Sequence, residues 1–251
     1  MFWTWAQLLQ LCVANQIINP AEDLRNKPWR PVSSKRIALK HALVLRWSLV
    51  PICLIHSYAL GVPWQGLSLS LAGVLYNELG LGNHWLFKVL CNVWGYASFN
   101  TGAARVLSGT CTFTWVHGGI RTQTRIETNH SLGTIVVNSL IILTTVHAQD
   151  FCDETGDRLD GRRTLPIVWP EASRVLTLIT TPAWTFALLS ISVVNHFYAA
   201  AFIGLGFLVG MRFYFHRDVN SDRLSYIYYN VSTLILDAIL LSLTFWMIIS
   251  Y

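Results

Sequence analysis

The chain has 251 residues, of which 53% are hydrophobic and 12% are charged, and its formal net charge is +5 at pH 7. An ordinary soluble domain carries roughly 25% charged residues, so this composition and a mean hydropathy of +0.44 indicate a membrane protein. The basic residues lie in the loops between apolar segments and at their ends. This distribution argues against nucleic acid as a partner and makes the lipid bilayer the expected surroundings.

Apolar segments that approach the ~20 residues needed to cross a bilayer recur along the whole chain. The eight segments that we identify lie at about 2–18, 36–61, 63–82, 84–108, 128–150, 172–194, 196–215 and 224–250. Because they cover the whole length, we expect an all-α, multi-pass transmembrane helical bundle. Residues 1–251 should form a single integral-membrane domain.

The basic residues are distributed unequally between the two sides that alternate loops would occupy. One side would collect Arg25, Lys27, Arg30, Lys35, Arg36, Lys40, Lys88, Arg158, Arg162, Arg163, Arg174, Arg212, Arg217 and Arg223. The other side would have Arg105, Arg121 and Arg125, and Arg46 lies within a segment. Such asymmetry orients the basic side toward the cytoplasm. In a eukaryote we expect the endoplasmic reticulum membrane.

A first polar cluster follows the first apolar segment. Asn15, Asn19 and Asp23 are spaced four apart, so a continuous helix would align them in one stripe. Pro20 disfavours helical geometry at Asn19, and we expect a kink or break there. Three further residues complete the cluster: Glu22, Lys27 and Arg30. The cluster combines oxygen ligands of the type Mg²⁺ takes with cations of the type that bind phosphate, although a solvated juxtamembrane loop is the simpler alternative.

A second polar cluster closes the fifth apolar segment. Five of the thirteen acidic residues lie between Asp150 and Asp160. If the helix continues, Asp153 and Asp157 fall about 60° and 20° from Asp150 around its axis, on one face. Ionised side chains near a bilayer core cost at least ~2.5–3.5 kcal/mol each, and a divalent cation would remove that penalty. Both clusters are expected at the same membrane side, where they suit a diphosphate bridged by Mg²⁺.

The two clusters resemble the signatures of a known family. The pattern Asp150-x-x-Asp153-x-x-Gly156-Asp157, continued by Gly161 and Thr164-Leu165-Pro166, looks like the second signature of the UbiA superfamily of intramembrane prenyltransferases. Asn15-x-x-x-Asn19-x-x-x-Asp23 is similar to its first signature, Asn-x-x-x-Asp-x-x-x-Asp. The resemblance extends to Tyr76 and Lys88 near the loop between the third and fourth segments. Family members have nine helices, so the eight expected here would begin at the second.

Part of the first cluster resembles one branch of this superfamily more specifically. Asn19 replaces the middle Asp of the first signature, and Glu22-Asp23-x-x-Asn26-Lys27-Pro28-x-Arg30-Pro31 resembles the fungal branch that includes membrane-bound sesquiterpene cyclases. The substitution could weaken one metal site, where Glu22 offers a replacement carboxylate.

The resemblance implies ionisation of a prenyl diphosphate. Mg²⁺ would be held by both clusters, namely Asn15, Asn19, Glu22, Asp23, Asp150, Asp153 and Asp157. Substrate contacts are expected from Lys27, Arg30, Lys88, Arg162, Tyr76, Asn92 and Tyr96. An allylic cation would lie against aromatic faces, for which Trp94, Phe99 and Phe151 are further candidates, although each is more simply a packing residue. His147 is a candidate base, with a structural role as the simpler alternative.

Two reactions are open to the cation. Attack on the cation by its own double bonds would give terpene cyclisation. Attack by an aromatic or lipid molecule would give prenyl transfer to that hydrophobic acceptor. Few polar groups in the segments would select an acceptor, so we favour cyclisation of farnesyl diphosphate and keep transfer as the close alternative. An ion-coupled transporter also uses intramembrane carboxylates, but these acids gather at one membrane face.

Overall fold

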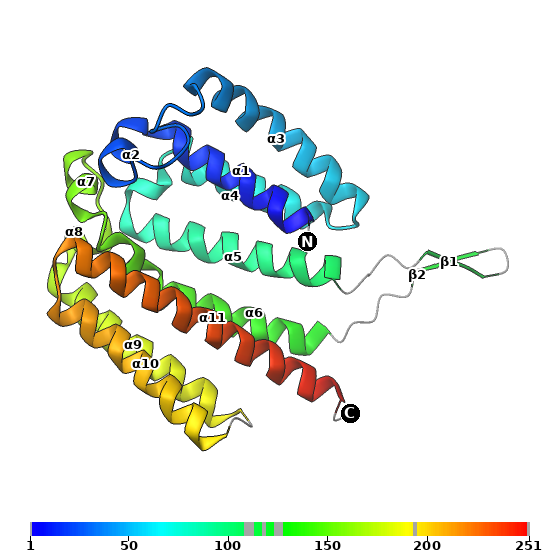
Figure 1. Ribbon diagram of the computed structural model, residues 1–251. Helices are drawn as coiled ribbons and strands as arrows, with labels where there is room; N and C mark the ends of the chain where they lie inside the picture. The colour runs from blue at the N-terminus through cyan, green and yellow to red at the C-terminus, as the bar shows by residue number, and fades with distance from the viewer. Residues whose placement is uncertain (1, 108–112, 117–118, 123–127, 193–194, 250–251) are drawn as a thin grey trace. The chain divides into compact units, whose positions relative to one another are not determined.

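The computed structural model describes residues 2–107, 113–116, 119–122, 128–192 and 195–249 (Figure 1). The chain forms two compact units. The first unit comprises residues 1–82 and 93–128, and the second comprises residues 83–92 and 129–251.

The first unit is built from helices that pack around α1. Its elements are α1 (Phe2–Ile18), α2 (Pro20–Asn26), α3 (Leu39–Ala59), α4 (Pro63–Tyr76), the 3₁₀ turn η1 (Leu81–Asn83) and most of α5 (Trp85–Leu107). Helix α1 packs against α3 and α4, which also contact each other. Two antiparallel strands, β1 (Phe113–Val116) and β2 (Gly119–Thr122), pair with each other and were not expected from the sequence. Their register pairs residue 113 with residue 122.

Polar side chains bridge the helices inside this unit. The Trp3 indole N–H donates to the Ser57 hydroxyl at 2.8 Å, and Gln7 donates to the same oxygen at 3.0 Å. Arg46, fully buried on α3, pairs with Glu78 at 2.9 Å. Interhelical hydrogen bonds of this kind are typical of helices that pack within a membrane. The pairing also explains how a charged residue is accommodated inside an apolar segment.

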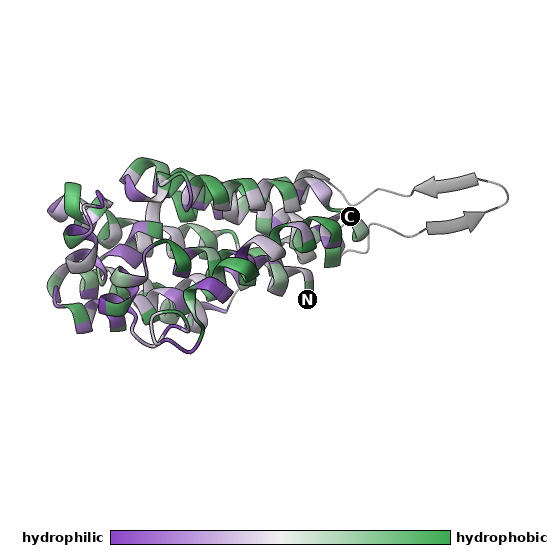
Figure 2. Cartoon of the chain, turned by 90° about the horizontal axis from the view of Figure 1, so that it is seen from above, coloured by the Kyte–Doolittle hydropathy of each residue, from purple (hydrophilic) through white to green (hydrophobic). Residues whose placement is uncertain are grey.

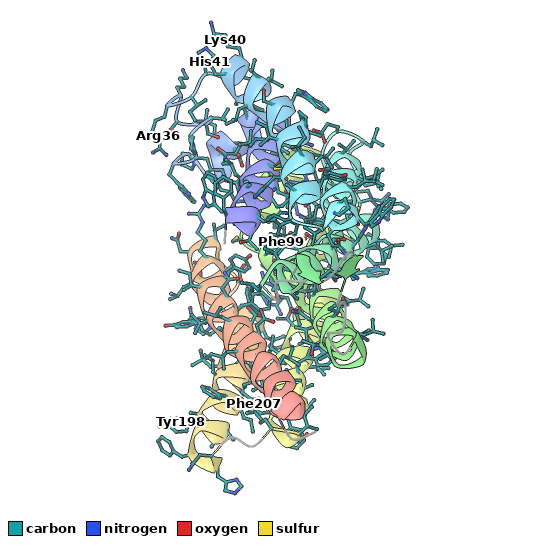
Figure 3. The ribbon with its side chains drawn as sticks, turned by 90° about the vertical axis from the view of Figure 1, so that its right-hand side faces the viewer. Arg36, Lys40, His41, Phe99, Tyr198 and Phe207 are labelled. Carbon is teal, nitrogen blue, oxygen red and sulfur yellow. The ribbon has the colours of Figure 1, made fainter. Side chains whose placement is uncertain are left out.

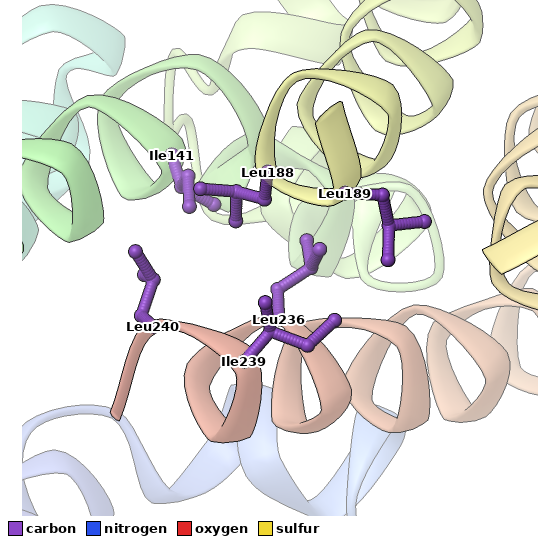
Figure 4. Packing of buried hydrophobic residues seen from close by; sticks show 6 residues of the cluster. All are labelled: Ile141, Leu188, Leu189, Leu236, Ile239 and Leu240. Carbon is purple, nitrogen blue, oxygen red and sulfur yellow. The ribbon is translucent and has the colours of Figure 1, made fainter. Parts of the chain in front are cut away.

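The second unit is a bundle of longer helices joined to a group of short ones. Its elements are α6 (Thr128–Thr145), the 3₁₀ turn η2 (Val146–Asp150), α7 (Glu154–Leu159), α8 (Leu165–Val168), α9 (Pro170–Ser190), α10 (His196–Phe215) and α11 (Val219–Ile249). Gly210 lets α10 approach α9, because a Cβ there would lie 2.9 Å from Thr181 Oγ1 and 3.0 Å from the Leu178 backbone. Side chains of α6, α9 and α11 meet in a hydrophobic core (Figure 4), formed by Ile141, Leu188, Leu189, Leu236, Ile239 and Leu240.

The eight apolar segments predicted from the sequence each contain a long helix, and the all-α bundle is confirmed. Hydrophobic residues recur along these helices (Figure 2). Among the described residues, Leu39–Ala59, Leu132–Asp150 and His196–Phe215 are long and apolar enough to cross a membrane. Helices α1, with 17 residues, and α4, with 14, fall short of the length that a span needs. At the start of α3, the exposed side chains of Arg36, Lys40 and His41 extend outward (Figure 3).

Candidate active site

The acidic segment of the second unit is a succession of turns. Helix α6 ends at Thr145, the 3₁₀ turn runs to Asp150, and α7 begins only at Glu154. The single helix on which the three aspartates would share one face therefore does not continue. The amide of Asp153 donates to the Asp150 carbonyl at 3.3 Å, and the amide of Asp157 donates to the Asp153 carbonyl at 2.9 Å. These bonds connect the aspartates through the backbone.

Lys88 lies directly against this segment. Its Nζ donates to Asp150 Oδ1 at 2.6 Å, and both side chains are buried, with exposures of 6% and 4%. A short backbone pairing brings Lys88 there: the amide of Trp85 donates to the Arg163 carbonyl, and the amide of Arg163 donates to the Asn83 carbonyl, both at 2.8 Å. The first turn of α5 is thus fixed to the loop that follows α7.

Arg162 supplies a second cation. Its Nη1 donates to Asp157 Oδ1 at 3.0 Å, after a turn in which Gly161 adopts a φ of +71°. Glycine takes this left-handed conformation without the strain that a side chain would add. Burial raises the pKa of the Asp157 carboxyl above its ordinary value, and the neighbouring Lys88 and Arg162 oppose this effect. The second carboxylate oxygen of Asp157 is buried and has no hydrogen-bond partner in the part of the chain described.

Two other predicted residues border this group. Asn92 Nδ2 donates to the backbone carbonyl of Lys88 at 2.9 Å, so its amide braces the lysine's own turn. Asp153 is partly exposed and receives a weak contact from the Cys152 thiol at 3.7 Å. We call Lys88, Asp150, Asp153, Asp157 and Arg162 the acidic-turn cluster. It brings together all predicted site residues of the second unit except Asn92, which supports it from α5.

The first cluster contains the helix break that was expected at Pro20. Helix α1 ends at Ile18, Asn19 has φ −136° and ψ 73°, and α2 begins at Pro20. Asn19 Nδ2 lies 3.4 Å from Glu22 Oε2. The break destroys the single stripe that a continuous helix would have given.

Asp23 and Arg30 form the centre of the first cluster. Arg30 Nη1 donates to both carboxylate oxygens of Asp23, at 2.8 Å and 3.0 Å. Asp23 is buried, and its carbonyl accepts from the Lys27 amide at 2.7 Å. Asn15 lies on an exposed position of α1. Because this cluster belongs to the first unit and the acidic-turn cluster to the second, their expected meeting around one substrate stays a prediction.

The aromatic candidates divide between packing and exposed positions. The ring of Tyr76 lies against Gly82, where an added Cβ would approach it to 2.8 Å. Trp94 donates to the Ser68 hydroxyl at 2.7 Å, and Phe99 lies 6.1 Å from the Trp3 ring. Tyr96 is 47% exposed. Tyr96 is thus the most exposed of these helix α5 candidates.

Two residues near Asp150 are packed inside the second unit. Phe151 is buried in a hydrophobic cluster and packs on Phe213 at 5.1 Å. His147 is enclosed, and its Nε2 lies 2.9 Å from Thr177 Oγ1. These contacts assign His147 the structural role that was the simpler alternative. They assign Phe151 to packing.

The donor atoms of the acidic-turn cluster meet the needs of Mg²⁺ only in part. Within the described residues, no three His, Cys, Asp or Glu side chains are grouped closely enough to hold a metal ion. In the second unit, Lys88 and Arg162 pair with two of the carboxylates. However, Mg²⁺ usually takes one or two carboxylates and completes its shell with water and substrate phosphates. The unpartnered oxygen of Asp157 and the partly exposed Asp153 fit that smaller demand.

Three residues that hold the cluster in place were not predicted from the sequence. Asn83, Trp85 and Arg163 act through backbone hydrogen bonds. No side-chain pattern signals such bonds.

Comparisons with known proteins complete the description. The UbiA prenyltransferase family matches residues 1–234. The chain is 30% identical over 236 residues to the fumagillin beta-trans-bergamotene synthase of Aspergillus fumigatus, covering 90% of this chain and 74% of the relative. It is 26% identical over 240 residues to the somaliensene A/B synthase of Streptomyces somaliensis, with coverages of 90% and 73%. A solved structure from work on digeranylgeranylglyceryl phosphate synthase in membranes is similar in fold, with a TM-score of 0.59 and 17% identity, covering 95% of this chain and 83% of that one.

Proposed function

The chain belongs to the UbiA prenyltransferase family, and from this premise we propose that it ionises farnesyl diphosphate and cyclises the resulting cation to a sesquiterpene. It is an integral membrane protein, and its family acts on prenyl diphosphates within the bilayer. Mg²⁺ is the proposed cofactor. We also propose the endoplasmic reticulum membrane of a eukaryotic cell, with the active face toward the cytoplasm.

The observation that carries the proposal is the acidic-turn cluster. It pairs two cations with two buried carboxylates at the end of an apolar helix, with one carboxylate oxygen left without a partner among the described residues. A buried oxygen of this kind can be completed by a bound ion or ligand. A diphosphate with its metal ion brings both negative oxygens for Lys88 and Arg162 and a positive centre for the carboxylates.

The residues of this chain act on the leaving group in complementary ways. Lys88 and Arg162 can bind diphosphate oxygens once they are drawn from Asp150 and Asp157, and Arg162 can do so with two N–H groups. Asp150, Asp153 and Asp157 would hold Mg²⁺ there, and Asp23 and Glu22 would hold it at the first cluster. Bound Mg²⁺ supplies Lewis-acid stabilisation of the charge that develops on the leaving group. Asn15 and Asn19 are further proposed metal ligands of the first cluster, and Lys27 and Arg30 are its proposed contacts to the substrate.

Ionisation breaks the bond between the allylic carbon and the diphosphate oxygen, and the electron pair leaves with the diphosphate. A distal double bond of the same chain then donates its π electrons to the allylic carbon, which forms the ring and moves the positive charge. A proton then passes from a neighbouring carbon to the released diphosphate, and the C–H electron pair forms the double bond of a hydrocarbon. Apolar helix walls would favour this course because they exclude the water that would otherwise give an acyclic alcohol.

Cyclisation is preferred to transfer because both curated relatives are named as synthases of terpenes. The fold similarity to the structure from work on digeranylgeranylglyceryl phosphate synthase does not choose between the reactions. Tyr96, with its exposed ring, is the proposed contact for the cation. Tyr76 and Asn92 are further proposed contacts to the substrate.

The deciding experiment incubates the purified protein in lipid vesicles with Mg²⁺ and farnesyl diphosphate, without an acceptor. The proposal expects diphosphate release and a cyclic product in the hexane extract, and added phenolic or quinone precursors should leave the rate unchanged. Product formation that requires such a precursor, with the prenyl chain attached to it, would replace the cyclase by a transferase. The Asp157→Asn variant, which keeps the size of the side chain, is the matched control for a contaminating activity.

A further inference from the structure

A buried charged group lies at the start of α9, outside the acidic-turn cluster. Arg174 pairs with Asp222 of α11 through two bonds, Nη1 to Oδ1 at 2.6 Å and Nη2 to Oδ2 at 2.8 Å. Arg174 Nη1 also donates to the Phe213 carbonyl of α10 at 2.7 Å. Exposures of 6% and 1% show that both charged residues are enclosed. One guanidinium therefore connects three helices of the second unit.

A face of this guanidinium is covered by Phe151. The Arg174 Cζ atom lies 4.0 Å from the centre of the Phe151 ring, which is close contact for a cation on an aromatic face. Phe151 is the residue directly after Asp150. The arginine therefore fixes the end of the 3₁₀ turn that presents Asp150 to Lys88.

A second contact fixes the same turn one step earlier. His147 Nε2 lies 2.9 Å from Thr177 Oγ1 and 3.2 Å from the Ser173 carbonyl, both on α9. Ser173, Arg174 and Thr177 thus lie near the start of α9 and hold the turn at both His147 and Phe151. A carboxylate on a 3₁₀ turn lacks the rigidity of a longer helix, so support of this kind determines where its oxygens lie.

We propose that Arg174, held by Asp222, is a positioning residue that places Asp150 for leaving-group binding by stacking on Phe151. The inference rests on the proposed function, since Asp150 must act on the substrate for its position to matter. Supporting residues around a metal or catalytic group typically contribute 10–100-fold to affinity or activity when they are replaced. The placement of the Phe151 ring should therefore affect turnover although the ring never contacts the substrate.

The main test is F151L, which removes the ring and leaves the Arg174–Asp222 ion pair intact. We expect kcat for farnesyl diphosphate to fall roughly 10-fold with a smaller change in KM. W47L is the matched control, because Trp47 also lies under an arginine, with the Arg46 Cζ atom 5.3 Å from its ring, but belongs to the first unit. Its kcat should stay within about twofold of the parent value, as expected for a residue that acts independently of the site.

A double-mutant cycle separates positioning from general weakening of the fold. If the ring acts through Asp150, F151L should cause no further loss in the D150N background, because coupled residues are not additive. Equal losses in both backgrounds would overturn the inference, as would an F151L variant whose kcat matches that of the parent. Parental turnover by D150N alone would instead overturn the assignment of Asp150 in the proposed function.

Hydrogen exchange provides a readout that does not depend on turnover. Amides between residues 146 and 157 should exchange several-fold faster in F151L and in R174K, whose ammonium cannot make the two parallel bonds or the flat stack. W47L should leave these amides unchanged. Unaltered exchange in both F151L and R174K would show that Arg174 does not hold the turn. Two variants are used so that the test still stands if one of them is poorly stable.

Discussion

Removal of the Lys88 charge is the most direct test of the acidic-turn cluster. In K88M, Asp150 would keep its buried position and lose the ammonium that lies 2.6 Å away. Coulomb attraction at that distance is roughly 6 kcal/mol with an effective dielectric constant of about 20, most of it offset by desolvation. Breaking a buried pair by removing one partner typically costs about 3–5 kcal/mol, and the exposures of 6% and 4% place this pair in that class.

The loss should be visible as a lower melting temperature in detergent. For a chain of this size we expect a decrease of roughly 6–20 °C for K88M. The double variant K88M/D150N should regain most of the stability, because the neutral amide introduced by D150N leaves no buried charge without a partner. Turnover should stay about 100-fold or more below the parental value in both variants, since both lack a charge that stabilises the leaving group.

The buried Arg46–Glu78 pair of the first unit is the matched control for this experiment. Its N–O distance is 2.9 Å and the Arg46 side chain is 1% exposed. R46M should lower the melting temperature comparably, and at temperatures below its own transition it should retain turnover. Parental stability and turnover of K88M would refute the reasoning. Recovery of turnover in K88M/D150N would show that the pair serves stability alone.

Three further predictions follow from other parts of the molecule. D153N and D157N should each lose most turnover under saturating Mg²⁺ with little change in protein yield, because each loses a charged ligand; near-parental rates in Mg²⁺ titrations would contradict the metal assignment. The hydrogen bond from Arg217 lowers the pKa of the Glu171 carboxyl. This pair therefore stabilises the fold above the ordinary carboxyl pKa, and the stabilisation is lost as pH falls through the lowered pKa. Because Glu171 is exposed, E171Q should change the melting temperature by only about 1 °C in scans from roughly pH 3 to 7. A cysteine at Ser34 should react with an impermeant maleimide from the cytoplasmic side and one at Thr122 only from the opposite side, in a background without the native exposed thiols, and labelling of both from one side would overturn the predicted topology.

The sequence determined the helices more completely than the turns between them. Each of the eight apolar segments corresponds to a helix, with lengths from 14 residues in α4 to 31 in α11, because a sustained apolar run favours a helix in a membrane protein. The break at Pro20 was predictable because proline restricts its own φ and the residue before it. The end of α6 at Thr145 was not, because no proline or glycine marks the 3₁₀ turn that follows. That turn depends on contacts with α9, which are distant in the sequence.

The members of the site could be predicted more readily than their partners. Spacing and charge identified Asp150, Asp157, Lys88 and Arg162, but spacing does not show that each carboxylate already holds one of these cations. The pairing arises because backbone bonds near Arg163 join two segments that lie about 80 residues apart. Backbone hydrogen bonds of this kind leave no side-chain pattern in the sequence. The sequence can therefore indicate which residues belong to the site but not their resting contacts, that is, the contacts that they make without substrate.

These resting contacts bear on how the site accepts its substrate. A cluster of carboxylates alone would repel itself, and a cluster of cations alone would do the same, so each set would destabilise the fold without the other. Pairing Lys88 with Asp150 and Arg162 with Asp157 balances these charges before substrate binds. If a diphosphate arrives with Mg²⁺, its oxygens would pair with Lys88 and Arg162 while the Mg²⁺ would pair with Asp150 and Asp157. Each of these charged side chains would then still face an opposite charge. A diphosphate without Mg²⁺ would draw the cations away and leave the carboxylates without a counter-charge, so binding of the two should be mutually dependent.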